Sequence, residues 1–375
     1  MDQDNQRLQP TTGVHSSQVD QDNQRLQPTQ SRGSTQVGLC ELAGRPEYDM
    51  RLAFELSGEN TSIPRAEVLA LFNGTIWREL ERVLVIDVNT YDPTLGERLA
   101  MTHAILEVKD ICSQELESIY QAAGSIELPS VRVAVRAKRI GHGLKSAEVE
   151  ATIGKALAER GYKIDLTHPQ LLVRALLSKD VCIIGATLAL IDRSRFESRR
   201  PRLRPYFYPG VLLPRLARAA VNLTRVKAEE LLLDPFCGTG GILLEAGLLG
   251  AIILGSDVDG RMVFGTKMNL DYYDVLSDLL VQDARRLGLR DECVDAVATD
   301  LPYGRSVSVR AHSLNQLTAA ALGEIFRVLK GNARAVLISH GPIEREVTDA
   351  GFTIEGRYTQ YVHKSLTREI VVARK

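Results

Sequence analysis

The sequence has little of several features that define common protein classes. Its five cysteines (Cys40, Cys112, Cys182, Cys237 and Cys293) are far apart and form neither a CxxC pair nor a Cys/His cluster. The sequence therefore indicates neither a disulfide framework nor a zinc site of the usual spacings, and we expect no metal. No apolar run approaches the roughly 20 residues that span a bilayer, and the N-terminus lacks the basic-then-apolar pattern of a secretory signal. We expect a cytoplasmic protein with no membrane partner.

The net charge of -1 hides an uneven distribution of charge along the chain. Residues 36–129 carry 7 basic and 16 acidic side chains, whereas residues 130–205 carry 16 basic and 7 acidic ones. A basic block of this kind favours a phosphate-bearing partner such as a nucleic acid. Charge alone leaves open the alternative of a merely solvated face.

The first residues form a separate segment. The ten residues DQDNQRLQPT occur at positions 2–11 and again at 20–29, in a stretch rich in Gln, Asn and Asp. Such a stretch has too little apolar surface to offset the entropy lost on ordering. We expect a disordered leader over residues 1–36.

Two folded parts joined by a linker are expected in the remaining chain. Strands and helices alternate over residues 37–195, which predicts a small α+β module with a helix over 146–161 that is capped by Ser146. Residues 196–210 break this periodicity, with four arginines and three prolines between positions 199 and 209, and indicate an extended linker. Its arginines either keep the linker solvated or, together with Tyr206, Phe207 and Tyr208, line a channel for nucleic acid.

The last part, residues 211–375, alternates strand and helix regularly and ends in two strands that pair antiparallel. This order predicts a mostly parallel sheet covered by helices on both faces, with ligands bound at the carboxyl ends of the strands.

A glycine-rich turn, DPFCGTGG at 234–241, follows the first strand of this part. It lacks the GxxxxGK[ST] pattern of a nucleotide P-loop and the GxGxxG spacing of a pyrophosphate site, and Asp234 would repel a pyrophosphate. The turn favours a compact cationic cofactor instead. Asp257 ends the second strand, where it is placed to accept hydrogen bonds from a ribose, and Asp283 ends the third, where it and the amide of Ala284 are placed to bind adenine.

The stretch TDLPYGRS, residues 299–306, follows the fourth strand. It is either an ordinary exit from a strand or a cradle for a planar amino group. In the cradle, the carboxylate of Asp300 and a carbonyl of Leu301 or Pro302 accept hydrogen bonds from the nitrogen, and Tyr303 stacks on the base.

These motifs resemble those of a known family. DLPYG resembles the [DNS]-P-P-[YFW] signature of class I amino-methyltransferases, with Leu301 in place of the first proline, and DPFCGTGGILLEA is similar to their cofactor motif. Residues from about 38 to 375 resemble the archaeal tRNA guanosine-10 amino-methyltransferases, which join a ferredoxin-like and THUMP module to a class I, Rossmann-like domain with a seven-stranded mostly parallel sheet.

The resemblance implies S-adenosylmethionine as cofactor, tRNA as partner and the 2-amino group of guanosine 10 as methyl acceptor. In some relatives a small activator subunit is required, and the sequence leaves this open, as it does the choice between one and two methyl groups. Implied catalytic residues are Asp300, Pro302 and Tyr303. Implied cofactor-binding residues are Asp234, Phe236, Gly238, Thr239, Gly240, Gly241, Asp257, Val258, Asp283 and Ala284. Implied RNA-binding residues are Arg132, Arg136, Lys138, Arg139, Lys145, Arg199, Arg200, Arg202 and Arg204.

Three alternatives stay open at this point. The chain is a methyltransferase for another guanosine in tRNA or rRNA, a DNA amino-methyltransferase that acts on a flipped base, or a non-catalytic RNA-binding protein. The absence of an evident DNA-recognition element disfavours the second, and the full set of strand-end acids and glycines disfavours the third.

Overall fold

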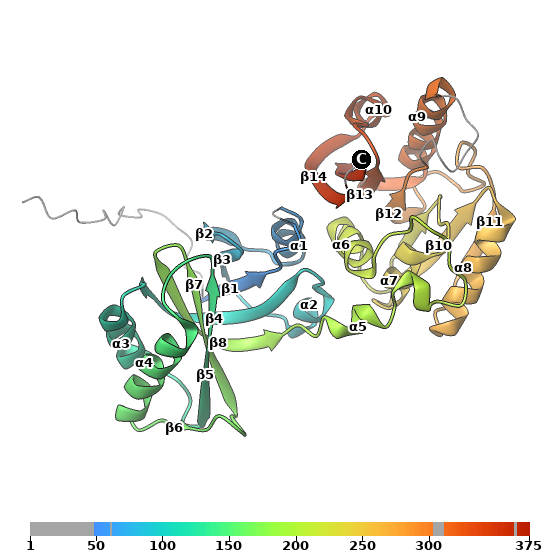
Figure 1. Cartoon of the computed structure of the whole chain (residues 1–375). Helices are drawn as coiled ribbons and strands as arrows, with labels where there is room; N and C mark the ends of the chain where they lie inside the picture. The colour runs from blue at the N-terminus through green and yellow to red at the C-terminus, as the bar shows by residue number, and fades with distance from the viewer. Residues whose placement is uncertain (1–48, 61, 303–310, 364–365) are drawn as a thin grey trace, which may run out of the picture. The chain divides into compact units, whose positions relative to one another are not determined.

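The computed structural model describes residues 49–60, 62–302, 311–363 and 366–375, with the side chains of residues 311–313 and 363 left aside. The predicted leader lies outside these residues. Two β-sheets carry the described chain, one built from residues 50–190 and the other from residues 231–374 (Figure 1). Among the described helices, none is long and apolar enough to cross a membrane.

The first sheet has eight strands in the order β2-β3-β1-β4-β8-β7-β5-β6. The strands are β1 (Met50–Leu56), β2 (Thr75–Leu80), β3 (Val83–Val88), β4 (Thr102–Ser113), β5 (Arg132–Ile140), β6 (Lys163–Ile164), β7 (Leu171–Ser178) and β8 (Val181–Leu190). The long strands β4 and β8 pair antiparallel along most of their length and join the two halves of the sheet. The sequence predicted the elements of this α+β module but not that one continuous sheet runs through it.

Four helices pack on this sheet, namely α1 (Ile63–Leu71), α2 (Pro93–Arg98), α3 (Leu116–Ser125) and α4 (Ser146–Glu159). Val149, Ile153 and Leu157 form the buried stripe of α4, as their spacing predicts. The expected cap at Ser146 is wrong by one residue, because Lys145 occupies the cap position. The backbone N–H of Lys145 donates to the side chain of Glu148 at 3.3 Å, and this bond sets the start of the helix.

A short connecting segment holds α5 (Ser194–Glu197) and a 3-10 turn at Pro201–Leu203, and it leads into α6 (Pro214–Thr224). Seven strands follow in the order β11-β10-β9-β12-β13-β15-β14. The strands are β9 (Leu231–Asp234), β10 (Ile252–Asp257), β11 (Asp278–Val281), β12 (Val294–Asp300), β13 (Leu329–Ser339), β14 (Thr353–His363) and β15 (Leu366–Arg374). Neighbouring strands from β11 to β13 are parallel, and β15 runs antiparallel to both β13 and β14. The predicted seven-stranded, mostly parallel sheet with a terminal antiparallel pair is confirmed.

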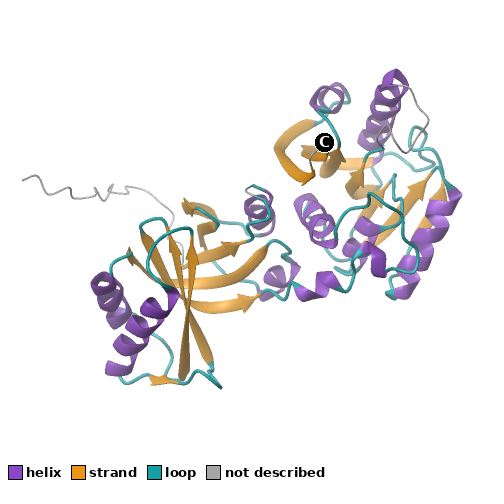
Figure 2. Ribbon diagram, in the orientation of Figure 1, coloured by secondary structure: helices purple, strands orange, loops and turns teal. Residues whose placement is uncertain are grey.

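Helices cover both faces of the seven-stranded sheet (Figure 2). They are α6, α7 (Gly241–Gly247), α8 (Gly260–Tyr272), α9 (Ala311–Val328) and α10 (Glu344–Asp349). One apolar cluster joins α6 and α7 to the sheet, and a second joins α9 and α10 to the opposite face. The side chains of the central strands β9, β10 and β12 are therefore largely buried on both faces, and polar ligands reach these strands at their carboxyl ends.

Candidate active site

The glycine-rich turn between β9 and α7 has a backbone that only glycine adopts easily. Gly238 and Gly240 have φ angles of +52° and +77°. A Cβ on Gly240 would lie 2.8 Å from the Cγ2 atom of Thr266, whereas nothing comes closer than 4.0 Å to a Cβ on Gly238. The turn is therefore tight on the side of α8 and open at Gly238, where a ligand can approach the backbone.

Two buried side chains of α8 hold this turn in place. The hydroxyl of Thr266 donates to the carbonyl of Gly238 at 2.7 Å, and the Nδ2 atom of Asn269 donates to the carbonyl of Thr239 at 2.9 Å. Sequence reasoning missed both residues. The signal was present, since two small polar side chains three residues apart share one face of a helix that packs on the sheet.

Asp234 is an internal part of this framework. It is buried at the end of β9, where its carboxyl accepts hydrogen bonds from the amide of Phe236 at 3.2 Å and from the hydroxyl of Thr299 at 2.7 Å. Burial raises the pKa of Asp234 to about 7, and the nearby Asp300 and Asp257 carboxylates act in the same direction. Its bonds fix the turn to β12.

Asp257, the last residue of β10, joins the end of that strand to the glycine-rich turn. One carboxylate oxygen accepts a hydrogen bond from the amide of Gly238 at 3.1 Å and the other from the amide of Asp259 at 2.9 Å. Burial raises the pKa of Asp257. Val258, which follows it, is exposed.

Asp283 lies beyond β11 and is the most exposed of the four predicted acids. Its carboxylate pairs with the guanidinium of Arg285 at 2.6 Å, and bonds to that side chain and backbone lower its pKa. Ala284 beside it is buried. The amide of Gln282 donates to the carbonyl of Asp257 at 3.1 Å, so the ends of β10 and β11 stay together.

Asp300 ends β12 and is the acid with the least protein bonding. Its side chain is 19% exposed, and its Oδ1 atom has no hydrogen-bond partner among the described residues. The Nη2 atom of Arg368 lies 4.0 Å from its Oδ2 atom. Burial raises the pKa of Asp300 to about 6, although the positive charge of Arg368 acts to lower it.

The residues after Asp300 are described only in part. Leu301 is buried and its amide donates to the carbonyl of Ile338 at 2.8 Å, while Pro302 is half-buried. This bond prevents the chain from leaving the sheet directly after Asp300. Tyr303 lies outside the described residues.

The arginines of the connecting segment divide into two groups. Arg199 and Arg204 are largely buried, and the guanidinium of Arg199 pairs with the buried carboxylate of Glu245 at 2.8 Å. RNA contact by these two residues is therefore not supported by the structure, because their guanidinium groups are directed into the protein. Arg200 and Arg202 are exposed.

The basic residues of the first sheet lie on its surface. Arg136, Lys138 and Arg139 on β5 are exposed, as is Lys145 before α4, and Arg132 is half-buried near Asp165. Strand alternation places Arg136 and Lys138 on one face of β5 and Arg139 on the other.

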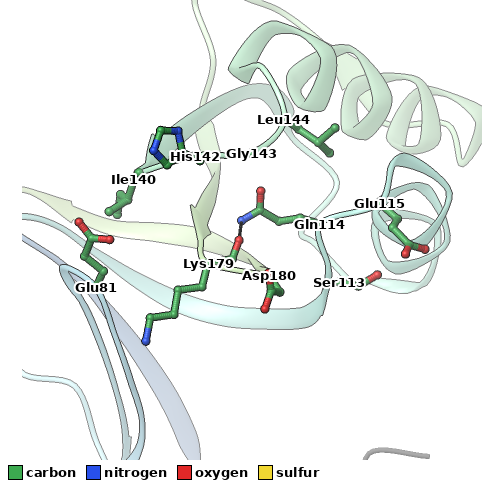
Figure 3. Close-up of a pocket in the computed structure, with 11 residues that line it drawn as sticks. Glu81, Ser113, Gln114, Glu115, Ile140, His142, Gly143, Leu144, Lys179 and Asp180 are labelled. Carbon is green, nitrogen blue, oxygen red and sulfur yellow. Dashed lines mark hydrogen bonds between the residues drawn. The ribbon is translucent and has the colours of Figure 1, made fainter. Parts of the chain in front are cut away.

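A cavity of about 680 Å³ lies beside the end of β5. Figure 3 shows Gln114, His142, Lys179 and Asp180 around it, with the Gln114 side chain bonded to the main-chain carbonyl of Lys179. The cavity wall also includes the loop from Gly141 to Leu144, which leads directly to Lys145. The exposed basic side chains of β5 and this cavity therefore lie in the same part of the first sheet.

The second sheet thus collects the predicted acids and glycines at one edge. The open backbone at Gly238 and the half-buried carboxylate of Asp257 fit a ligand with ribose hydroxyls, and the Oδ1 atom of Asp300 fits a hydrogen-bond donor. In the described part of the chain, no group of His, Cys, Asp and Glu is suited to a metal ion.

Comparison with known proteins relates both sheets to described families. Residues 201–370 match the model of the RMKL-like methyltransferase domain, and residues 113–187 match that of the THUMP domain. The fold is similar to that of TrmN from Thermus thermophilus, with a TM-score of 0.50 and 21% identity, over 87% of this chain and 99% of that one.

Two curated relatives match nearly end to end. The tRNA (guanine(10)-N2)-dimethyltransferase of Methanothermobacter thermautotrophicus is 38% identical over 336 residues, which cover 86% of this chain and 99% of the relative. The enzyme of the same description from Methanocaldococcus jannaschii is 33% identical over 359 residues, again 86% and 99% of the two chains. This chain belongs to the family of the archaeal tRNA (guanine(10)-N2)-dimethyltransferases.

Proposed function

We propose that this protein is an S-adenosylmethionine-dependent methyltransferase that methylates the 2-amino group of guanosine 10 in tRNA, and that it adds two methyl groups. The observation that carries the proposal is the meeting of Asp234, Asp257 and Asp300 with the Gly238 turn at one edge of the second sheet. The two relatives described as dimethyltransferases, each matched over nearly its whole length, support the choice of base and the methyl count.

The turn and the strand ends would hold the cofactor. We assign its ribose to Asp257, its adenine to Asp283 and the amide of Ala284, and its closest backbone approach to Gly238. Phe236, Thr239, Gly240, Gly241 and Val258 complete this set. The bound cofactor supplies an electrophilic methyl group on a sulfonium, whose positive charge is compatible with an edge lined by carboxylates.

Asp300 would act on the amino group of the base. That nitrogen is a poor nucleophile, because its lone pair is delocalised into the ring. A carboxylate oxygen and a neighbouring carbonyl that accept its two hydrogens favour a pyramidal nitrogen, and the base is held for direct attack. The N–C bond forms as the S–C bond breaks, and the proton released from nitrogen passes to Asp300 or to water.

We propose that the basic side chains of the first sheet bind the tRNA backbone. Arg136, Lys138, Arg139 and Lys145 are exposed on and just after β5, the strand that ends beside the 680 Å³ cavity of Figure 3. Arg200 and Arg202 add two exposed cations on the connecting segment. Phosphate contacts fix the position of an RNA without selecting its sequence, so distance from these contacts to Asp300 would select the nucleotide.

The experiment uses the full-length protein alone, an unmodified tRNA transcript and labelled S-adenosylmethionine. We expect label at nucleotide 10, first as a monomethylated and then as a dimethylated guanosine, when digested RNA is analysed by mass spectrometry. Label at another nucleotide of the tRNA would favour the alternative that the protein methylates a different guanosine. Binding of cofactor and tRNA without methylation would indicate a missing activator subunit, which a relative's cell extract should then supply.

A further inference from the structure

A single arginine connects the catalytic acid, the last strand and the connecting segment. Arg368 lies on β15 and is 5% exposed. Its Nη2 atom donates to the carbonyl of Gly210 at 2.7 Å and lies 4.0 Å from the Oδ2 atom of Asp300. Nothing in the sequence pattern singled out this residue.

The strand register explains why the two side chains meet. Asp300 of β12 and Ile370 of β15 are both paired with Ile338 of β13, which lies between them. Because side chains alternate in strands, Arg368 shares the face of Ile370, on the same side of the sheet as Asp300. The fold therefore brings a buried guanidinium close to the buried carboxylate.

The same arginine anchors the connecting segment at the carboxyl edge. Asn269, which holds the Thr239 carbonyl of the glycine-rich turn, also binds the amide and the carbonyl of Tyr206 at 2.8 and 2.9 Å. Four residues later, Gly210 binds Arg368. Residues 206–210 are thus fixed at one end beside the turn and at the other beside Asp300.

We propose that Arg368 is a positioning residue for methyl transfer: it keeps the Asp300 carboxylate charged and oriented toward the amino group, and ties residues 206–210 to the same edge. A protonated Asp300 carries a hydrogen on one carboxyl oxygen and would accept hydrogen bonds from the amino group more weakly than the carboxylate does. This inference rests on the proposed role of Asp300.

The other titratable groups near Asp300 do not replace this charge. Asp234 at the end of β9 is itself an acid, whose pKa the Asp300 carboxylate helps to raise, so it supplies no positive charge to Asp300. His340, just past β13, has its pKa lowered to about 4 by burial and by Arg368, so it is neutral in the working range of pH. Arg368 is the only cation within ion-pair distance of Asp300 among the described residues.

The first test measures Asp300 directly in the ligand-free protein, by ¹³C NMR titration of labelled aspartate carboxyls, with Asp300→Asn identifying the resonance. An opposite charge at this distance lowers a carboxyl pKa by about one unit or more, so Arg368→Gln should raise the titration midpoint by at least about one unit. Arg368→Lys keeps a cation and should shift it by less. Arg374→Gln, on the same strand but in a surface pair with Glu355, is the matched control and should leave it unchanged.

The second test compares rates of methyl transfer across pH in single turnovers. With a midpoint raised by one unit, Arg368→Gln should be about five-fold slower near pH 6 and within about two-fold of the wild type near pH 9. Cofactor binding by each variant verifies that it is folded. An unchanged Asp300 midpoint in Arg368→Gln, or an equal loss of rate at every pH, would overturn the proposal. Absence of methylation in the wild type even after a relative's cell extract is added, together with the expected NMR shift, would instead reject the proposed function alone.

Discussion

At the scale of single residues, the acids at the carboxyl edge of the second sheet differ in how many hydrogen bonds the protein donates to their carboxyl oxygens. Asp234 accepts hydrogen bonds from Thr299 and from the amide of Phe236, and it holds the turn. Asp300 leaves one carboxylate oxygen without a partner in the described part of the chain. A buried acceptor without a partner is costly to keep unless a ligand uses it. This difference supports a structural role for Asp234 and agrees with the proposed role of Asp300 in the chemistry.

Replacing Asp300 by asparagine should separate function from stability. We expect methyl transfer to fall by about 100-fold or more, because the amide is a weaker acceptor and cannot take up a proton, while cofactor affinity changes little. Single-turnover kinetics and equilibrium dialysis measure the two quantities. Near wild-type turnover by this variant would contradict the proposal that Asp300 holds the amino group of the base.

The pH dependence of stability follows from the raised pKa of Asp300, about 6 in the folded protein. The folded state binds this proton more tightly than the unfolded state, so the stabilisation is complete below about pH 4 and is lost as the pH rises through about 6. At about pH 8, Asp300→Asn should therefore increase the free energy of unfolding by roughly 1–3 kcal/mol. Urea denaturation near pH 5 and pH 8 measures this, and a variant that loses stability at the higher pH would contradict it.

Gly240 offers a test of the turn. Its φ of +77° opposes a side chain, and so does the distance of only 2.8 Å between a Cβ at this position and the Cγ2 atom of Thr266. We expect Gly240→Ala to weaken S-adenosylmethionine binding by about ten-fold or more, since strain of roughly 1–3 kcal/mol must displace the turn. Gly154→Ala on α4, where nothing lies within 4 Å and φ is ordinary, is the control and should keep full affinity.

At the scale of elements, the connecting segment is packed on the protein by a buried cluster of charges. Glu245 of α7 is fully buried and pairs with Arg199 at 2.8 Å and with Arg218 of α6 at 2.9 Å. Both guanidiniums also lie over the ring of Phe196. A lone acid within the apolar run ILLEAGLL was the sequence signal for this cluster, because a buried carboxylate requires cations.

Glu245→Gln should be strongly destabilising, since it leaves two buried guanidiniums without a counter-charge. We expect a loss of about 3–5 kcal/mol in the free energy of unfolding. Glu355→Gln removes the partner of Arg334 and Arg374 at the surface and should cost less than about 1 kcal/mol. Equal effects of the two variants in denaturant titrations would show that the cluster does not hold the segment.

At the scale of the whole molecule, local sequence patterns predicted the secondary-structure elements and the residues at the strand ends, but not the contacts between side chains that are distant in the sequence. Strand-end acids, glycine spacing and regular alternation predicted the second sheet and the edge where Asp257 and Asp300 lie, because sheet topology follows from element order. The burial of Arg199 and Arg204 and the approach of Arg368 to Asp300 depend on distant residues, Glu245 and Gly210 among them. The sequence pattern around Glu245 signals that a buried acid needs cations, but periodicity does not show which distant residues supply such contacts.

The basic surface of the first sheet should contribute affinity for tRNA without affecting the cofactor. Lys138→Glu should weaken tRNA binding by about ten-fold and reduce its salt dependence by about one charge equivalent, because a phosphate contact is lost. Lys267→Glu, an equal charge change on exposed α8, should have a smaller effect. Filter binding at several salt concentrations measures both, and equal weakening would place the RNA elsewhere.

The most direct test of the central claim compares two tRNAs that differ in one amino group. One transcript carries guanosine at position 10, and the other carries inosine there, which lacks the 2-amino group and is otherwise the same base. We predict that the full-length protein with S-adenosylmethionine methylates the first tRNA and leaves the second unlabelled, although it binds both with similar affinity. Equal incorporation of methyl groups into both would contradict the assignment of that amino group as the acceptor.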